Sequence, residues 1–251
     1  MSTKARALLL DLSGVLYEGS TVIDGAIDTV NSARRRGLIL RFVTNTATKS
    51  STTILQDLRR MQIDIHDDEL YTAPIAARAY IEQNQLYPYY LIHQAIRDEF
   101  DPVSAQQPNA VVLGDARDDL NYATLNQAFQ HCLAGAPLIA IGMNKYFKDD
   151  EGIKLDAGPF VKAIEWAADT QAIVMGKPSV DFFKQVVAST GVPANECLMV
   201  GDDVIADVKG AVDAGLQGCL VQTGKYQAGD EAKLPASARM IASIADLFEP
   251  D

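Results

Sequence analysis

The sequence predicts an α/β protein whose core is a doubly wound parallel sheet, with a smaller α/β domain inserted into it. Short apolar runs each end at a small or polar residue, as buried parallel strands do where they enter a loop. Amphipathic helical patterns lie between most of these runs. More than a hundred residues separate Thr44 from Lys177, which is too many for one crossover helix and indicates an inserted domain.

Five apolar runs are the predicted strands of the core sheet: Ala7–Leu10, Leu38–Val43, Ala172–Met175, Cys197–Val200 and Cys219–Val221. The helices expected between them are Ile27–Arg35, Ser50–Arg60 and Asp181–Ser189, and glycines at 37 and 191 stop the first and the third. In a doubly wound, Rossmann-like sheet the loops after the strands gather at one edge. We therefore expect the polar residues that follow the strands to meet there: Asp11, Thr44, Lys177 and Asp202.

The inserted segment has the pattern of a domain with its own sheet. We expect the core to comprise residues 1–79 and 173–251, and the inserted α/β cap to comprise residues 80–172. The predicted strands of the cap are Tyr89–Ile92, Ala110–Leu113 and Leu138–Ile141. A helix is expected over Asp119–Leu133, with Leu125, Phe129 and Cys132 facing inward, and another from Gly158-Pro159 through Trp166.

The composition is that of a globular chain, with 48% hydrophobic and 22% charged residues among 251. The net charge of −11 argues against nucleic acid or an anionic membrane as the main partner. The chain shows no signal-peptide pattern and no window with the ~18 apolar residues of a membrane span, so a cytoplasmic location is expected. The cysteines are odd in number and set in apolar runs, so we expect them to be reduced and buried: Cys132, Cys197 and Cys219.

Asp11 stands at the end of the first predicted strand, and Gly14 and a loop follow it. A carboxylate in that position is accessible but rigidly held, which suits a nucleophile that attacks phosphorus. Taken alone, the same residue is more often the cap of a turn. The residues expected beside it favour the nucleophile.

Three carboxylates are crowded into the segment Gly201–Asp207, at Asp202, Asp203 and Asp207. Such carboxylates repel one another unless a cation or hydrogen bonds offset their charge. Carboxylate oxygens are hard ligands of the kind that Mg²⁺ binds, so we expect a Mg²⁺ ion shared with Asp11. The alternative is a helix amino terminus, whose dipole favours acidic residues but would explain only one or two of the three.

Lys177 follows another predicted strand and is expected to neutralise phosphate oxygens and the charge of the nucleophile. Thr44 and Asn45 add neutral hydrogen-bond donors, and the helix that begins near Ser50 can add backbone N–H groups. Each of these residues alone is ordinary for a surface or a turn. Their order along the chain, each after an apolar run, is more specific than any one of them.

These four groups resemble the motifs of the haloacid dehalogenase (HAD) superfamily, and the resemblance covers nearly the whole chain. The matching stretches are Asp11–Tyr17 (DLSGVLY), Thr44-Asn45, Gly176–Ser179 with its lysine, and Gly201-Asp202 with Asp207 after it. An α/β insertion between the second and third motifs is similar to the subfamily with a large C2-type cap. The resemblance implies a phosphohydrolase that forms an aspartyl-phosphate intermediate with the help of Mg²⁺.

The resemblance also implies a role for each matched residue. Asp11 is then the nucleophile and a metal ligand, together with Asp202 and the backbone carbonyl of Ser13. The phosphoryl group would be held by Thr44 and Lys177, with Ser13, Gly14 and Asn45 beside it. Asp203 would be a further metal contact, and Asp207 would steady metal-bound water or Lys177.

Ser13 stands where most phosphatases of that superfamily have a second aspartate, which acts as general acid and base. A hydroxyl group is a poor substitute, and the loss of general acid–base catalysis costs ~10²–10⁴ in rate. We therefore expect a preference for good leaving groups, as in pyrophosphate, P–N bonds and aryl phosphates. The alternatives are a phosphate- or metal-binding regulatory protein of the same fold, and a phosphotransferase. A nucleotide-binding dehydrogenase is disfavoured because no Gly-x-Gly-x-x-Gly turn follows the first strand.

Cap residues are expected to set the choice among small phosphorylated substrates, because a cap closes over the edge of its core. The candidates follow cap strands: His93 and Asp115, and Asn144 and Lys145 as phosphate-binding residues. A lone polar residue in a loop is, however, more often surface than site. An alternative is that the apolar face of the cap forms a homodimer interface.

Overall fold

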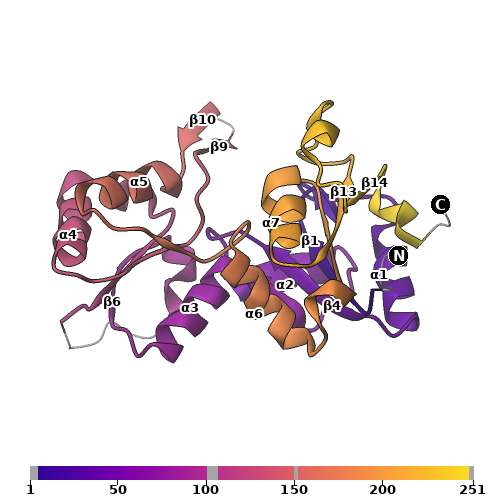
Figure 1. Ribbon diagram of the computed structural model, residues 1–251, viewed down its shortest axis with the longest axis horizontal. Helices are drawn as coiled ribbons and strands as arrows, with labels where there is room; N and C mark the ends of the chain where they lie inside the picture. The colour runs from indigo at the N-terminus through magenta and orange to yellow at the C-terminus, as the bar shows by residue number, and fades with distance from the viewer. Residues whose placement is uncertain (1–4, 101–106, 150–151, 249–251) are drawn as a thin grey trace. The chain divides into compact units, whose positions relative to one another are not determined.

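The computed structural model describes residues 5–100, 107–149 and 152–248 (Figure 1). The chain forms two compact units. The first, called the core unit below, comprises residues 1–44, 52–71 and 177–251, and the second, called the cap unit, comprises residues 45–51 and 72–176. Each unit has its own sheet, so the predicted α/β fold with an inserted α/β domain is confirmed. The boundaries expected after residues 79 and 172 stay a prediction.

The core unit is built on a six-stranded sheet with the order β14-β13-β12-β1-β4-β5. Its strands are β1 (Ala7–Asp11), β4 (Ile39–Thr44), β5 (Leu70–Thr72), β12 (Cys197–Gly201), β13 (Gln217–Val221) and β14 (Arg239–Ile241). β1 pairs in parallel with β12 on one side and with β4 on the other. The order of the strands therefore reverses beside β1, and α/β sheets bind ligands in the crevice at such a reversal.

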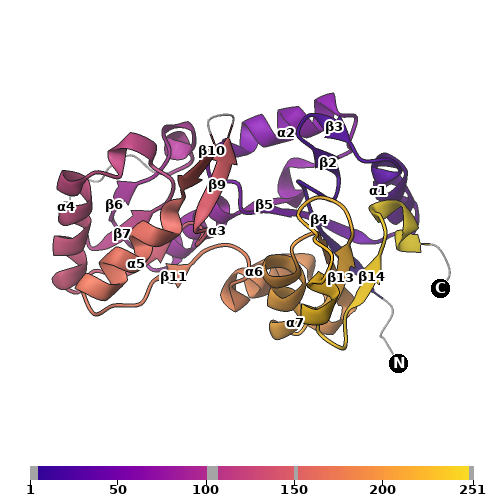
Figure 2. The ribbon, with the colours of Figure 1, turned by 90° about the horizontal axis from the view of Figure 1, so that it is seen from above.

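Helices cover both faces of the core sheet (Figure 2). α1 (Ala26–Arg35) and α2 (Ser51–Arg60) lie on one side, and α6 (Val180–Thr190) and α7 (Gly210–Asp213) lie on the other. Because strand side chains alternate, Leu8 and Phe42 belong to the apolar cluster of α1 and α2. α6 begins where Ser179 Oγ accepts the N–H of Phe182, and it ends at the predicted stop, Gly191.

The cap unit has a four-stranded parallel sheet with the order β11-β8-β7-β6. Its strands are β6 (Pro88–Leu91), β7 (Ala110–Leu113), β8 (Leu138–Ala140) and β11 (Ile173–Val174), and its helices are α3 (Ala73–Gln83), α4 (Tyr122–Leu133) and α5 (Ala157–Ala167). The inward face predicted for α4 is confirmed, because Cys132 is buried and Leu125 and Phe129 pack against the same cluster. That cluster joins α4 and α5 to β7 and β8.

One strand predicted for the core sheet belongs to the cap sheet instead. Within Ala172–Met175 only residues 173–174 form a strand, and this strand, β11, pairs with Ile139 and Ala140 of β8. The prediction was wrong because an apolar run indicates a buried strand but does not indicate which strand it pairs with. The chain resumes the core unit at Lys177. Lys177 therefore enters the core unit from a loop that follows a cap strand.

Several short elements lie outside the predicted pattern. Two antiparallel ribbons pair β2 (Tyr17–Glu18) with β3 (Thr21–Val22) and β9 (Tyr146–Asp149) with β10 (Gly152–Leu155). The short 3-10 helices are η1 (Asp67–Glu69), η2 (Gln94–Glu99), η3 (Arg117–Asp119), η4 (Ala194–Glu196), η6 (Asp230–Lys233) and η7 (Ile244–Phe248), and a π-helix, η5 (Val204–Lys209), precedes α7. Among the described residues, no helix has both the length and the apolar character needed to cross a membrane.

The three cysteines are buried and unbonded, as the sequence predicts. Burial raises the pKa of both Cys132 and Cys219 to about 11. These thiols therefore stay protonated at neutral pH and fill the core as apolar side chains.

Candidate active site

Three buried carboxylates meet in the core unit, at the carboxyl ends of β1 and β12. Asp11 is the last residue of β1, Asp202 follows β12, and Asp207 lies on η5. Oxygen atoms of the three groups lie within 4.8 Å of one another. The reversal of strand order beside β1 therefore carries a concentrated negative charge.

Lys177 joins two of these carboxylates. Its Nζ lies 2.7 Å from Asp11 Oδ1 and 2.6 Å from Asp207 Oδ1, and it donates to the backbone oxygen of Val43 at 3.4 Å. Burial disfavours the charged ammonium group, but the two carboxylates outweigh this effect and raise the pKa of Lys177 above its usual value. Lys177 is therefore a fixed cation beside Asp11 at neutral pH.

The remaining charge of the cluster is negative. Burial raises the pKa of Asp202 to about 7, and the charge of Asp11 adds to that rise. Burial also raises the pKa of Asp207 to about 6, although Lys177 opposes the shift. Both shifts mean that the folded chain disfavours the fully ionised cluster, so a bound cation would stabilise it.

The oxygen atoms of this cluster fit a Mg²⁺ ion. Asp202 Oδ2 accepts the backbone N–H of Lys225 at 2.7 Å, whereas Asp202 Oδ1 is buried and has no hydrogen-bond partner among the described residues. A buried polar atom without a partner is costly unless a ligand takes it. Carboxylate oxygens are the ligands that Mg²⁺ prefers, so the residues present suit the metal that the sequence predicts.

Asp207 is held from both sides. One of its oxygens contacts Lys177, and the other accepts the backbone N–H of Asp203 at 3.1 Å. A Cβ atom at Gly201 would lie 2.2 Å from Asp207 Cβ, so this close approach requires glycine at the end of β12. Asp203 itself caps η5, where its Oδ1 accepts two backbone N–H groups.

The other residues predicted for the core edge lie nearby in the same unit. Thr44 ends β4, the neighbour of β1, and is buried. Ser13 lies in the turn after β1 with its side chain exposed. Gly14 is buried, and its N–H donates to Tyr17 O at 2.7 Å, so it is engaged within the turn.

The remaining predicted residues belong to the cap unit: Asn45, His93, Asp115, Asn144 and Lys145. His93 Nδ1 accepts a backbone N–H two residues further on, and Asp115 is buried and pairs with Arg117 at 3.2 Å. Asn144 and Lys145 are exposed. Their roles toward a phosphate group or a substrate stay predictions.

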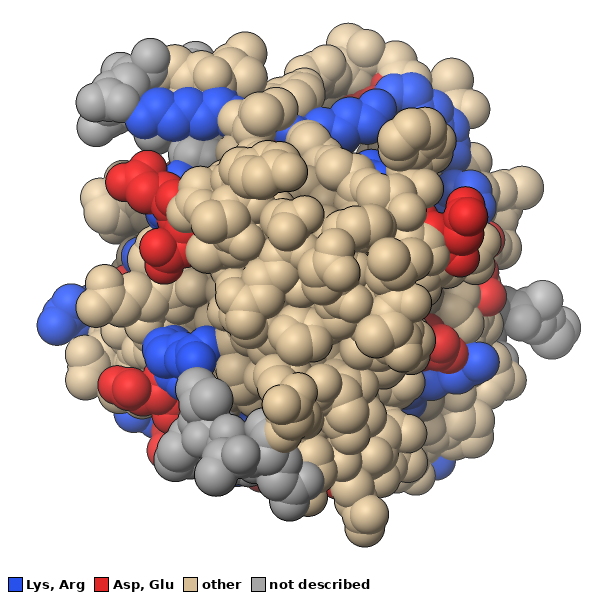
Figure 3. Space-filling view, turned by 90° about the vertical axis from the view of Figure 1, so that its left-hand side faces the viewer, with Lys and Arg blue, Asp and Glu red and all other residues tan. Residues whose placement is uncertain are grey.

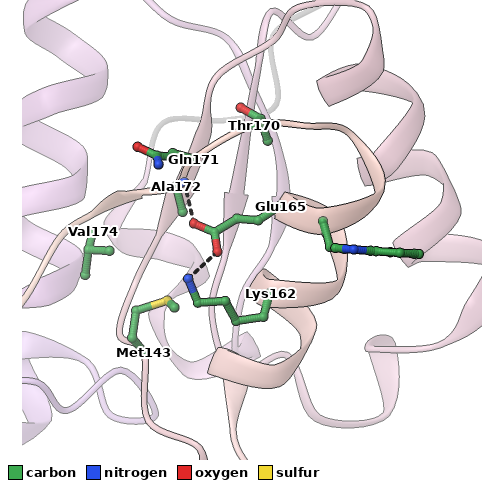
Figure 4. Close-up of a pocket in the computed structure, with 8 residues that line it drawn as sticks. Met143, Lys162, Glu165, Thr170, Gln171, Ala172 and Val174 are labelled. Atoms are coloured by element: carbon green, nitrogen blue, oxygen red, sulfur yellow. Dashed lines mark hydrogen bonds and ion pairs between the residues drawn. The ribbon is translucent and has the colours of Figure 1, made fainter.

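A separate pocket of about 480 Å³ in the cap unit contains none of the predicted site residues (Figure 4). Glu165 of α5 lies across it, 2.6 Å from Lys162 Nζ, and accepts the backbone N–H of Ala172 at 2.8 Å. These contacts tie α5 to the segment that leads into β11. They pair the two charged side chains that line the pocket, Lys162 and Glu165, with each other.

Sequence reasoning missed the loop after β13, Thr223–Lys225. This loop contacts the turn after β1, and it supplies the N–H group that holds Asp202 Oδ2. A signal was present, because a polar turn with a glycine follows a predicted strand at the same sheet edge as the other motifs.

Comparison with known proteins identifies the family. A model described as haloacid dehalogenase-like hydrolase matches residues 8–106, and one described as HAD-hydrolase-like matches residues 174–247. Haloacid dehalogenase-like hydrolase domain-containing protein 2 of Homo sapiens is 43% identical over 229 residues, which cover 91% of this chain and 88% of that protein. Phospholysine phosphohistidine inorganic pyrophosphate phosphatase of Homo sapiens is 41% identical, over 90% of this chain and 86% of that protein.

Solved structures share the fold. 4-Nitrophenylphosphatase from Thermotoga maritima has a TM-score of 0.87 at 23% identity and covers 97% of this chain and 96% of its own. NagD from E. coli K-12 has a TM-score of 0.86 at 21% identity, with 99% of both chains covered. The resemblance predicted from the motifs is thus confirmed: the chain belongs to the haloacid dehalogenase-like hydrolase family and is a phosphatase of that family.

Proposed function

We propose that this phosphatase depends on Mg²⁺, forms an aspartyl phosphate on Asp11, and favours substrates whose leaving group departs without a proton from the enzyme. Such substrates are pyrophosphate, compounds with P–N bonds and aryl phosphates. The observation that carries the proposal is the buried Asp11 carboxylate, held by Lys177 beside Asp202, with an exposed Ser13 where an acid would be needed. The names of the pyrophosphate and 4-nitrophenyl phosphatases agree with these substrate classes.

In the first step, a carboxylate oxygen of Asp11 attacks phosphorus. A new P–O bond forms, and the bond from phosphorus to the leaving group breaks, with its electron pair passing to the leaving group. Lys177 forms an ion pair with Asp11 Oδ1 and keeps its proton during this step. It therefore orients the nucleophile and offsets negative charge on the phosphoryl oxygens. The hydroxyl of Thr44, at the end of the adjacent strand, would hold the same group.

Asp11, Asp202 and the backbone carbonyl of Ser13 would hold the Mg²⁺ ion. When bound, the ion supplies positive charge next to the phosphoryl group that Asp11 attacks. Asp207 is engaged by Lys177 and by a backbone N–H, so its role is to keep the lysine in place.

The serine at position 13 sets the substrate preference. Its hydroxyl does not protonate an alkoxide leaving group, and the loss of such help costs ~10²–10⁴ in rate. Leaving groups that are stable as anions, or that carry their own proton, avoid most of this loss. In the second step water attacks the phosphorus of the aspartyl phosphate, and the P–O bond to Asp11 breaks with its electron pair returning to the Asp11 carboxylate. Asp203, which is less buried than Asp207, is the group proposed to take the proton from the water.

A substrate panel beside the Asp11→Asn variant tests this function. The panel holds pyrophosphate, a phosphoramidate, 4-nitrophenyl phosphate and glycerol phosphate, each assayed for phosphate release with Mg²⁺ and with EDTA. We expect turnover of the first three, little turnover of glycerol phosphate, and none in Asp11→Asn. Equal turnover of pyrophosphate and glycerol phosphate would contradict the leaving-group argument. An absolute requirement for an acceptor other than water would indicate a phosphotransferase instead.

The proposal includes a homodimer through the cap unit. Figure 3 shows a broad face without Lys, Arg, Asp or Glu, with charged residues around its rim. α4 contains no Lys, Arg, Asp or Glu, and Tyr122 and Leu133 at its two ends are exposed. Trp166 of α5, which packs beside α4, is 86% exposed. Exposed large apolar side chains are typical of an interface, and a second copy would bring the same uncharged face to the contact.

Sedimentation velocity tests the dimer. The double variant Leu133→Glu with Trp166→Glu is expected to be a monomer, because a second copy would bring like charges together in an apolar contact. Met240→Glu, which changes an exposed apolar residue of the core unit, is the matched control and is expected to stay dimeric. A monomeric wild type, or a double variant that stays dimeric, would contradict this part of the proposal.

A further inference from the structure

The loop Thr223–Lys225 ties together segments of the core unit that are far apart in sequence. Thr223 Oγ1 donates to the backbone oxygen of Gly14 at 2.5 Å, in the turn after β1. The N–H of Gly224 donates to Glu18 Oε1 at 2.8 Å, on β2. The loop is therefore anchored on the turn that carries Ser13 and leads out of the nucleophile's strand.

Two glycines enclose the carboxylate of Asp202. A Cβ atom at Gly14 would lie 2.0 Å from Asp202 Oδ2, and a Cβ atom at Gly224 would lie 2.2 Å from the same atom. The Cβ atom at Gly224 would also lie 2.5 Å from Gly14 Cα. Contacts under 3.0 Å force a shift, so a side chain at either position would displace Asp202 or the loop.

The loop holds one carboxylate oxygen of Asp202, Oδ2, and makes no hydrogen bond to the other, Oδ1. The backbone N–H of Lys225 holds Oδ2 at 2.7 Å, while the buried Oδ1 has no hydrogen-bond partner in the described part of the chain. Fixing one oxygen of a carboxylate also fixes the direction of the other. Outer partners of this kind orient metal ligands, and their loss typically costs ~10–100-fold in metal affinity.

We propose that the Thr223–Lys225 loop positions Asp202 for the metal by holding its Oδ2, and that Gly14 and Gly224 are required because this carboxylate fits between them. The inference rests on the proposed function, since it takes Asp202 as a ligand of Mg²⁺. The loop residues are positioning residues that act through Asp202. The side chain of Lys225 does not take part in holding Asp202, because it is 69% exposed and its Nζ lies 3.9 Å from Asp203.

Gly224→Ala tests the inference, with Gly191→Ala as its matched control. The two glycines have nearly the same left-handed φ, +64° and +68°, so alanine strains the backbone similarly at both. Nothing lies within 4 Å of a Cβ atom at Gly191, which stops α6. A second variant, Thr223→Val, removes the hydrogen bond to the backbone oxygen of Gly14 and does not replace a glycine in the left-handed region. If Gly224→Ala does not fold, Thr223→Val tests the inference in its place.

The measurement is the Kd of Mg²⁺ by isothermal titration calorimetry, together with the rise in Tm when Mg²⁺ is added to metal-free protein. We expect Gly224→Ala to bind Mg²⁺ at least ~10-fold more weakly than Gly191→Ala, and Thr223→Val to shift in the same direction from wild type. Lys225→Ala keeps the backbone N–H and is expected to bind Mg²⁺ within about threefold of wild type, as an exposed charge contributes little.

The outcomes separate this inference from the function on which it rests. Equal Mg²⁺ affinities of Gly224→Ala and Gly191→Ala, with wild type binding normally, would overturn the positioning role and leave the proposed function standing. Should Gly224→Ala not fold, a Thr223→Val variant with the Kd of wild type would overturn it in the same way. A wild-type protein that binds no Mg²⁺ would overturn both.

Discussion

Lys177→Met is expected to destabilise the metal-free protein strongly at pH 8. The lysine is 5% exposed, and its Nζ contacts Asp11 and Asp207 at 2.7 and 2.6 Å. Removing one partner of a buried ion pair leaves an uncompensated charge and costs ~3–5 kcal/mol. A loss of 1 kcal/mol lowers Tm by about 2–4 °C in a protein of this size, so the expected fall is about 6–20 °C. Methionine has a similar length, which limits any loss of packing.

Thermal unfolding followed by circular dichroism in EDTA measures the effect, with Lys184→Met as the matched control. Lys184 also pairs with an aspartate, Asp181, but its side chain is 66% exposed, so its loss is expected to cost no more than about 1 kcal/mol. At pH 5 the gap between Lys177→Met and wild type should narrow, because protonation of Asp207 removes part of the uncompensated charge. A Tm of Lys177→Met within about 2 °C of that of Lys184→Met at pH 8 would refute the electrostatic account of the site.

Three further predictions concern the catalytic acid, the pH dependence and the core. Ser13→Asp is expected to raise kcat/KM for glycerol phosphate by ~10²–10⁴ and to change that for pyrophosphate far less; equal gains for both substrates would contradict the leaving-group argument. In EDTA, Tm is expected to fall as pH rises from about 5 to 8, because folded-state pKa values of about 7 for Asp202 and about 6 for Asp207 lie above the unfolded value of ~3.9, so the folded chain binds more protons in this window. Differential scanning fluorimetry measures this fall in Tm with pH, which should be smaller in Asp202→Asn. Added Mg²⁺ should raise Tm most at pH 8. A metal-free Tm that rises between pH 5 and pH 8 would contradict the raised pKa values. Phe182→Ala, at a fully buried position on α6, should lower the free energy of unfolding by ~3–5 kcal/mol in urea titrations, whereas Tyr146→Ala at an exposed position should change it by no more than about 0.5 kcal/mol.

The parts of the fold that the sequence predicts are those with long, regular apolar patterns. Ala7–Leu10 and Cys197–Val200 are predicted within a residue of β1 and β12, because a buried parallel strand needs an unbroken apolar run. β5 and β14 have three residues each, which is too short for a periodic signal. The pairing of Ala172–Met175 was predicted wrongly because partner choice depends on contacts that local sequence does not encode.

The sequence likewise predicts some residues of the candidate site and not others. Side chains with charge or hydroxyl groups at strand ends, such as Asp11 and Lys177, are visible in the sequence because their chemistry depends on residue type. The position of the Thr223–Lys225 loop after a predicted strand indicates the sheet edge, but the loop holds Asp202 through a backbone N–H, which every residue except proline carries. Its residue types therefore do not identify this contact. The cap residues stay predictions, because substrate contacts depend on loops rather than on the regular pattern of strands.

Detection of the covalent intermediate tests whether Asp11 is the nucleophile. Wild-type protein is mixed with pyrophosphate and Mg²⁺, quenched in acid during turnover and reduced with borohydride, and the modified residue is identified by tandem mass spectrometry. We expect the phosphorylated residue to be Asp11, and we expect Asp11→Asn to show no modification and no phosphate release. A phosphoryl group on another residue, or turnover by Asp11→Asn, would contradict it.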